Sequence, residues 1–242
     1  MASLADLLRT VVTYVGGVLI TVVCAIAAII VSAVSPGSDA IEKVIHLWST
    51  TWLRISGTRL RVVGAEVVDT SRSYVVVANH ESAFDIMACF LAVPVPIRFL
   101  AKKELFRIPL LAQAMKAIGI VEVDRQARVA IHEQLNEQAK ALIAAGRSVI
   151  IYPEGTRTRT GALGPFKKGA FTIALGLGLP ILPVAIEGSY EAWRPGSFLI
   201  KGGEITVTIE APIETDGLER ADANDLRDRA REVIARVLES QS

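Results

Sequence analysis

From about residue 60 onward, short runs of β-branched and apolar residues alternate with longer stretches of helical periodicity. The runs predicted to be strands are residues 60–63, 74–78, 97–101, 119–123, 148–152, 181–187 and 204–210. The predicted helices are residues 83–92, 109–117, 128–145, 168–177 and 224–239. Pro183, inside the sixth strand, indicates an edge strand or a bulge. Such alternation predicts an α/β domain over residues 58–242, with a mostly parallel sheet flanked by helices.

The N-terminal part of the chain is strongly apolar. Arg9 and Asp39 enclose 29 uncharged residues, and a bilayer-spanning helix needs about 20 apolar ones. The mean hydropathy of the chain is +0.43, which is high for a soluble protein. A cleaved signal peptide is the competing interpretation, but this run is long for one and its N-terminal flank carries little charge. We therefore expect a membrane-associated helix here.

A second helix is predicted after the Ser-Pro-Gly-Ser sequence at residues 35–38, which ends the first helix. Its apolar side chains recur at helical spacing on one face: Ile41, Val44, Ile45, Trp48, Trp52 and Ile55. Two tryptophans with basic residues nearby fit a helix at a lipid interface, and an amphipathic helix packed on the domain is the alternative. Residues 1–57 are therefore predicted to be two membrane-associated helices, with the basic flank placing the rest on the cytoplasmic face of the inner (plasma) membrane. Whether the first helix spans the bilayer or only dips into it stays open.

Residues 79–85, Asn-His-Glu-Ser-Ala-Phe-Asp, connect a predicted strand to a predicted helix. If the chain turns between His80 and Asp85, the carboxylate can accept a hydrogen bond from one imidazole nitrogen. The other nitrogen can then take a proton from a hydroxyl group. Ser82 suits the N-cap of the helix better than the role of a nucleophile. Spacing alone leaves both a general base and simple capping open for this pair.

Two further predicted strands end in segments that carry arginine. Arg125 follows one of them, and residues 153–157, Pro-Glu-Gly-Thr-Arg, follow another. Between Arg147 and Gly169 there are five basic residues and one acidic residue. Guanidinium groups hold phosphate by charge-assisted, bidentate hydrogen bonds. Because carboxyl ends of parallel strands meet at one edge of a sheet, we expect a site for an anionic group beside His80.

These segments resemble the glycerolipid acyltransferases, most closely the 1-acylglycerol-3-phosphate (lysophosphatidate) acyltransferases. The family's four ordered blocks correspond to Asn79-His80 with Asp85, residues 123–125, residues 152–157 and residues 182–184. The match covers roughly residues 60–190, and the first and third blocks are highly specific in this order. Two departures are mild: Tyr152 stands where Phe is usual, and Thr158 where Ser often follows the arginine.

The resemblance implies acyl transfer from a thioester, either acyl-CoA or acyl-carrier protein, to the sn-2 hydroxyl of lysophosphatidate, giving phosphatidate for phospholipid synthesis. It implies that His80 is the base and Asp85 its orienting partner. The substrate-binding residues that it implies are Arg125, Glu154, Gly155, Thr156 and Arg157. Lys102 and Lys103, at the end of the third predicted strand, either join this pocket or are solvated surface lysines. No metal or redox cofactor is expected.

Other functions stay open at this stage. The same residues could serve acyl transfer to another lysophospholipid, a hydrolase or transacylase reaction, or non-catalytic binding of anionic membrane lipids. A formal net charge of +1 argues against a nucleic-acid partner. Cys24 and Cys89 lie in apolar segments without metal or redox spacing, and we expect buried free thiols.

Overall fold

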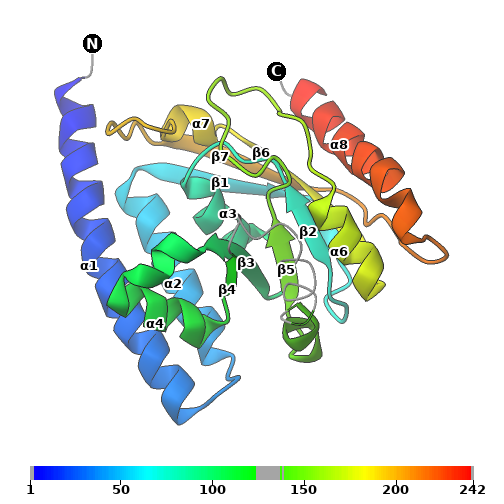
Figure 1. The fold of residues 1–242 in the computed structure, drawn as a ribbon. Coiled ribbons are helices and arrows are strands. Elements are labelled where there is room, and N and C mark those ends of the chain that lie inside the picture. Colours follow the sequence, from blue (N-terminus) through cyan, green and yellow to red (C-terminus); the bar gives the residue numbers. More distant parts are fainter. Residues whose placement is uncertain (1–2, 124–136, 138, 241–242) are drawn as a thin grey trace.

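The computed structural model describes residues 3–123, 137 and 139–240 (Figure 1). Within these residues, seven strands form one sheet in the order β1-β7-β6-β2-β5-β3-β4. The strands are β1 (Thr58–Val63), β2 (Val75–Ala78), β3 (Ile97–Lys102), β4 (Val121–Val123), β5 (Ser148–Ile151), β6 (Ile181–Glu187) and β7 (Gly203–Ile209). Each coincides with one of the predicted strands to within two residues at either end.

The sheet is parallel except at one pair of strands. β6, β2, β5, β3 and β4 run in the same direction, while β7 is antiparallel to β6 and parallel to β1. The carboxyl ends of five neighbouring strands therefore meet at one edge. The predicted fold class, a mostly parallel sheet flanked by helices, is confirmed.

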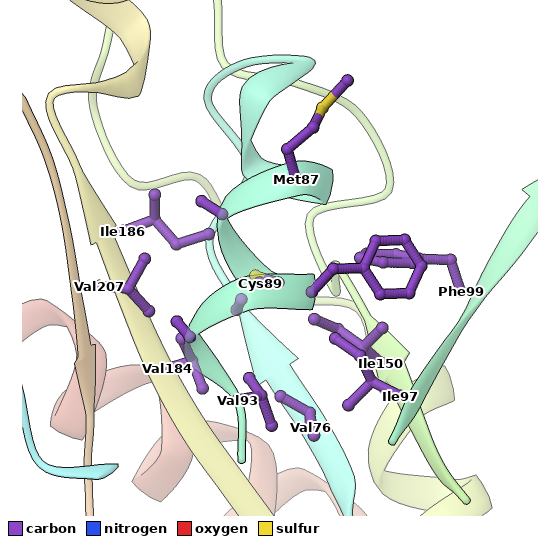
Figure 2. Close-up of a cluster of buried hydrophobic side chains, with 14 of the residues drawn as sticks. Val76, Met87, Cys89, Val93, Ile97, Phe99, Ile150, Val184, Ile186 and Val207 are labelled. Atoms are coloured by element: carbon purple, nitrogen blue, oxygen red, sulfur yellow. The ribbon is translucent and has the colours of Figure 1, made fainter. Parts of the chain in front are cut away.

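Both faces of the central strands are covered, because successive side chains on a strand point to opposite faces. Val76 and Ala78 belong to the apolar cluster under α2 (Ala40–Ile55) and α3 (Phe84–Ala92). Val75 and Val77 belong to the opposite cluster, with α6 (Gly169–Leu177) and α8 (Ala223–Ser240). Figure 2 shows the first cluster, in which the helix bearing Cys89 lies above Val76, Ile150 and Val184. The double cover explains why β2 reads as a continuous apolar run.

The N-terminal helices form an antiparallel pair beside the sheet (Figure 1). α1 (Leu4–Val34) and α2 meet at Thr21, whose hydroxyl accepts hydrogen bonds from Trp48 Nε1 at 2.9 Å and Trp52 Nε1 at 3.1 Å. Trp48 also contacts Phe90 edge-on, and Trp52 stacks on Trp193. The two tryptophans thus pack between protein elements, as in the alternative of an amphipathic helix packed on the domain.

α1 is the single described helix that is long and apolar enough to cross a membrane, judged by length and composition. It nevertheless lies along the domain. Arg9 Nη1 donates to Lys201 O, Thr10 Oγ1 accepts from Ile200 N at 3.0 Å, and the helix packs on α4 (Pro109–Ile118). Its other side exposes large apolar residues: Leu4, Leu7, Leu8, Val11, Val12, Val15, Val18, Leu19, Val22, Val23, Ile26, Ile30 and Val34.

A buried ion pair ties the helix pair to the sheet. Arg98, fully buried on β3, pairs with Glu42 of α2 and also donates to Ile118 O at the end of α4. The remaining short elements are η1 (Ala65–Val67), η2 (Lys103–Arg107), α7 (Ser189–Ala192) and η3 (Arg220–Asp222). Residues 139–144 are helical, and most of the helix predicted over residues 128–145 lies outside the described residues.

Candidate functional site

His80 and Asp85 are in contact at the carboxyl end of β2. His80 Nδ1 lies 2.8 Å from Asp85 Oδ2, and the imidazole side chain keeps 16% of its exposure while the carboxylate is fully buried. Because a carboxylate oxygen accepts hydrogen bonds, Nδ1 is the donor and Nε2 carries the lone pair. No described residue pairs with Nε2. This is the geometry of an oriented base at a partly open position.

Asp85 is fixed by the turn that precedes α3. Its Oδ2 also accepts from Glu81 N at 2.7 Å and from Ser82 N at 2.9 Å, so three donors converge on one oxygen. Ser82 Oγ accepts from Phe84 N and donates to Trp193 O at 2.8 Å. The N-cap itself is Ala83, so the predicted cap at Ser82 is wrong by one residue. The hydroxyl instead fastens the turn to the loop after α7.

Asn79 attaches the same turn to β6, and Glu81 attaches it to α7 (Ser189–Ala192). The Asn79 side chain accepts from Ile186 N at 2.8 Å and donates to Ile186 O at 2.7 Å, which extends the β2–β6 pairing by one residue. Glu81 accepts from Asn79 Nδ2 and Tyr190 N. Burial, with the nearby Asp85 charge, raises the pKa of Glu81 to about 8. These contacts give Asn79 and Glu81 structural roles next to the base.

The loop after β5 holds His80 from a second direction. Glu154 Oε1 accepts from the backbone N–H of His80 at 2.8 Å, and its Oε2 accepts from Gly164 N at 2.8 Å. Burial raises the pKa of this carboxyl above its ordinary value. Thr158 N in turn donates to His80 O at 2.9 Å. Both oxygens of Glu154 are therefore engaged by the chain itself, next to the imidazole.

Gly155 and Arg157 belong to the same loop. Gly155 has a φ of +74°, which favours glycine, and a Cβ at this position would lie 2.5 Å from Lys167 Nζ. The ammonium group thus lies directly over the loop backbone. Thr156 and Arg157 are exposed, and Arg157 makes no ion pair or side-chain hydrogen bond with the described part of the chain.

The predicted lysines and the remaining arginine follow the neighbouring strands. Lys102 is the last residue of β3, the strand next to β5, and it is exposed. Lys103 is the first residue of η2. Arg125 lies outside the described residues, two positions after the end of β4. The edge that carries His80 therefore also carries Lys102, Lys103 and Arg157.

One contact at the site was not predicted from the sequence. The ring of Tyr152 lies face to face with the His80 imidazole, with ring centroids 3.9 Å apart and planes 6° from parallel. The available signal was its position, directly before the loop of residues 153–157. The stack places an aromatic surface against the predicted base.

An apolar cavity of about 210 Å³ lies on the α1–α2 side of the sheet. Its lining comes from α1, α2, α3, α4 and β3, and includes Trp48, Phe90, Phe99, Leu111 and Met115. Phe99 also contacts Tyr152, at 5.8 Å between ring centroids, so the cavity wall continues to the stack on His80. Among the residues with described positions, no three His, Cys, Asp or Glu side chains are grouped as for a metal ion.

Comparison with known proteins agrees with this geometry. The family model named Acyltransferase matches residues 59–187, which include every strand on the His80 edge. The chain belongs to the acyltransferase family. Its solved neighbours include the 1-acyl-sn-glycerophosphate (LPA) acyltransferase PlsC from Thermotoga maritima, with a TM-score of 0.87 and 26% identity over 100% of this chain and 98% of that one.

Two relatives within the family have similar names. The 1-acyl-sn-glycerol-3-phosphate acyltransferase of Cocos nucifera is 36% identical over 74% of this chain, which spans 58% of the relative's length. The human 1-acyl-sn-glycerol-3-phosphate acyltransferase alpha is 30% identical over 88% of this chain and 75% of its own. The chain thus spans somewhat more than half of the plant acyltransferase and three quarters of the human one.

Proposed function

We propose that this protein transfers an acyl chain from an acyl thioester to the sn-2 hydroxyl of lysophosphatidate, giving phosphatidate. The observation that carries the proposal is the 2.8 Å contact between His80 Nδ1 and Asp85 Oδ2 at the strand edge that also bears Arg157. An oriented imidazole at the same sheet edge as Arg157, whose guanidinium pairs with none of the described residues, suits an alcohol that carries a phosphate on the same molecule. The names of the relatives support the same reaction.

In this reaction His80 Nε2 takes the proton from the acceptor hydroxyl as the oxygen attacks the thioester carbonyl. Asp85 holds the imidazole and stabilises the imidazolium that forms. When the tetrahedral intermediate collapses, the C–S bond breaks and the imidazolium returns the proton to the departing thiolate. No enzyme group becomes acylated, so the kinetics are sequential.

The phosphate group is assigned to the cationic edge. Arg157, Lys102 and Lys103 supply positive charge there, and the backbone of Gly155 and Thr156 lies in the same loop as Arg157. The family resemblance adds Arg125, which lies outside the described residues, as a further phosphate ligand. Glu154 acts differently, because its two oxygens accept from His80 N and Gly164 N. Its proposed role is to fix the position of the base relative to the loop.

The lipid parts of the substrates are assigned to the N-terminal side. The cavity lined by Trp48, Phe90 and Phe99 is apolar, and its wall residue Phe99 contacts Tyr152, which stacks on His80, so we place an acyl chain there. The exposed apolar residues of α1 would lie in the lipid, with the domain on the cytoplasmic face of the membrane. Because α1 contacts the domain through Arg9 and also packs on α4, we propose that it dips into one leaflet and does not form a separate span across the bilayer.

A thiol-release assay tests the function. Purified protein in detergent is given acyl-CoA or acyl-carrier protein as donor and lysophosphatidate or another lysophospholipid as acceptor. We expect thiol release that requires the acceptor and is fastest with lysophosphatidate. Thiol release without any acceptor would indicate a hydrolase, and acceptor binding without thiol release would indicate a lipid-binding protein. Preference for an acceptor without a phosphomonoester would reassign the substrate.

A further inference from the structure

We propose that Tyr152 is a positioning residue for the base, whose ring sets the plane of the His80 imidazole through the face-to-face stack. The inference rests on the proposed function, since it concerns the residue assigned as the base. Three groups then hold His80: Asp85 at Nδ1, Glu154 at the backbone N–H, and Tyr152 at the ring face. Two of the three come from the loop that follows β5.

The geometry of the stack suits a base that becomes charged. Aromatic pairs ordinarily prefer offset or edge-on arrangements, with centroids about 4.5–7 Å apart. The His80 and Tyr152 rings are closer, at 3.9 Å, and only 6° from parallel, so they overlap face to face. The negative face of a phenol ring repels a like ring but attracts a cation held over it. This arrangement therefore favours the imidazolium that forms while the acceptor hydroxyl is attacking.

Contacts with two neighbouring residues fix the position of the Tyr152 ring. Phe99 packs beside it at 5.8 Å between centroids, and its hydroxyl points to Cys89 Sγ at 3.9 Å. Cys89 is fully buried in α3, the helix that also carries Asp85. Both groups that orient the imidazole are thus anchored on the same helix.

The hydroxyl of Tyr152 has no place in the proton transfer. Burial raises the pKa of the Tyr152 phenol well above its ordinary value, so the group stays neutral. Its contact is with Cys89 rather than with an imidazole nitrogen. The ring, and not the hydroxyl, is therefore the part that acts on His80.

Three variants separate the ring from the hydroxyl. Tyr152→Phe keeps the stack, and we expect kcat within about twofold of the parent. Tyr152→Leu and the unbranched Tyr152→Met remove it, and we expect kcat to fall about 10–100-fold, as for a misplaced catalytic group, with the KM for lysophosphatidate unchanged. The matched control is Tyr74→Leu, the same change at a fully buried tyrosine at the opposite end of β2. It should lower the thermal midpoint and leave kcat unchanged.

A spectroscopic measurement makes the test independent of turnover. Ring currents from Tyr152 act on the carbon-bound protons of His80, so Tyr152→Leu should shift these NMR resonances and Tyr152→Phe should not. Full kcat in folded Tyr152→Leu or Tyr152→Met would overturn the proposal, as would a loss in Tyr152→Phe equal to that in Tyr152→Leu. If the parent protein released no thiol with any acceptor, the proposed function would fail, while the resonance shift would still report whether the stack exists.

Discussion

Different kinds of contact stabilise the edge of the sheet around His80 and the N-terminal helix pair. Around His80, besides the Tyr152 stack, the contacts are directed hydrogen bonds: Asp85 Oδ2 accepts three of them, and Glu154 accepts two from backbone N–H groups. Between α1 and α2 the contacts are mainly apolar, with small residues such as Gly17 allowing close approach and one threonine receiving two indole donors.

The two kinds of contact suit two different structural requirements. A general base must be held to within a fraction of an ångström of its productive position, which directed hydrogen bonds achieve. A helix that meets lipid needs an apolar surface and tolerates small displacements. Substitutions at the edge should therefore change rate with little change in stability, and substitutions between the helices should do the reverse.

Among the substitutions at the edge, His80→Ala should have the largest effect on the rate. Removing a general base typically lowers kcat by about 10²–10⁴-fold. We expect a loss of this size in thiol release with an unchanged thermal midpoint. His46→Ala is the control, because His46 is exposed on α2 and is not among the residues that contact His80. A kcat of His80→Ala near that of the parent would remove the base assignment.

Arg157→Ala should give the next largest effect. A hydrogen bond to a charged group contributes about 1.5–3 kcal/mol, which corresponds to about 10–150-fold in the KM for lysophosphatidate. Arg159→Ala removes an exposed guanidinium two residues further on, and it should change KM little. Equal effects in the two variants would indicate general electrostatic attraction in place of a specific phosphate contact. Arg125→Ala is expected to behave like Arg157→Ala.

The fold could be predicted from the sequence because buried parallel strands leave a simple pattern. All seven strands among the described residues were predicted, since most are short apolar runs bounded by turn residues. Of the two alternatives predicted from Pro183, the edge strand is wrong, because β6 lies between β7 and β2, and the bulge agrees with the strand register. Between the pairs Ile181–Ile213 and Val184–Ile209 the chain advances three residues on β6 and four on its partner, so a bulge lies opposite the proline.

Contacts between distant segments could not be predicted in the same way. His80 and Asp85 are close in sequence, so their spacing indicated their contact. Glu154 reaches His80 N across 74 residues, and nothing in its own segment shows that its oxygens face the chain instead of a ligand. The pattern in α2 likewise gives an apolar face without naming what covers it. The structure covers that face with α1 and α3.

Gly17→Ala probes the helix pair. A Cβ on Gly17 would lie 2.3 Å from the Trp52 ring, so either this ring or the two helices must shift. Overpacking of this kind costs about 1–3 kcal/mol, and we expect the thermal midpoint to fall by several degrees while kcat in detergent is retained. Gly16→Ala is the matched control, because its nearest atom is the Ile55 Cδ1 methyl at 3.2 Å. The prediction fails if the neighbouring substitution destabilises the protein as much.

Glu81→Gln should change stability and not rate, although Glu81 lies beside the base, because its contacts hold the turn. Its pKa is raised from 4.5 to about 8, so the folded protein binds a proton that the unfolded chain releases at lower pH. The resulting stability is fully present below pH 4.5 and is lost as the pH rises through about 8. Glutamine cannot titrate and should remove this dependence.

We expect equal thermal midpoints for Glu81→Gln and the parent at pH 4.5. At pH 9 the variant should melt higher, by about 2–4 °C for each kcal/mol of stability that the parent has lost through this titration. The groups that face Glu81 are Asp85, Glu191, Ser189, the Tyr190 N–H and the Asn79 amide. Glu191→Gln therefore serves as a control that removes a nearby charge while leaving the buried carboxyl. If Glu81 were instead ionised throughout, its hydrogen bonds would stabilise the fold at high pH and the variant would melt lower there. The sign of the difference at pH 9 thus decides whether the turn beside the base is held by a neutral carboxyl or by a charged one.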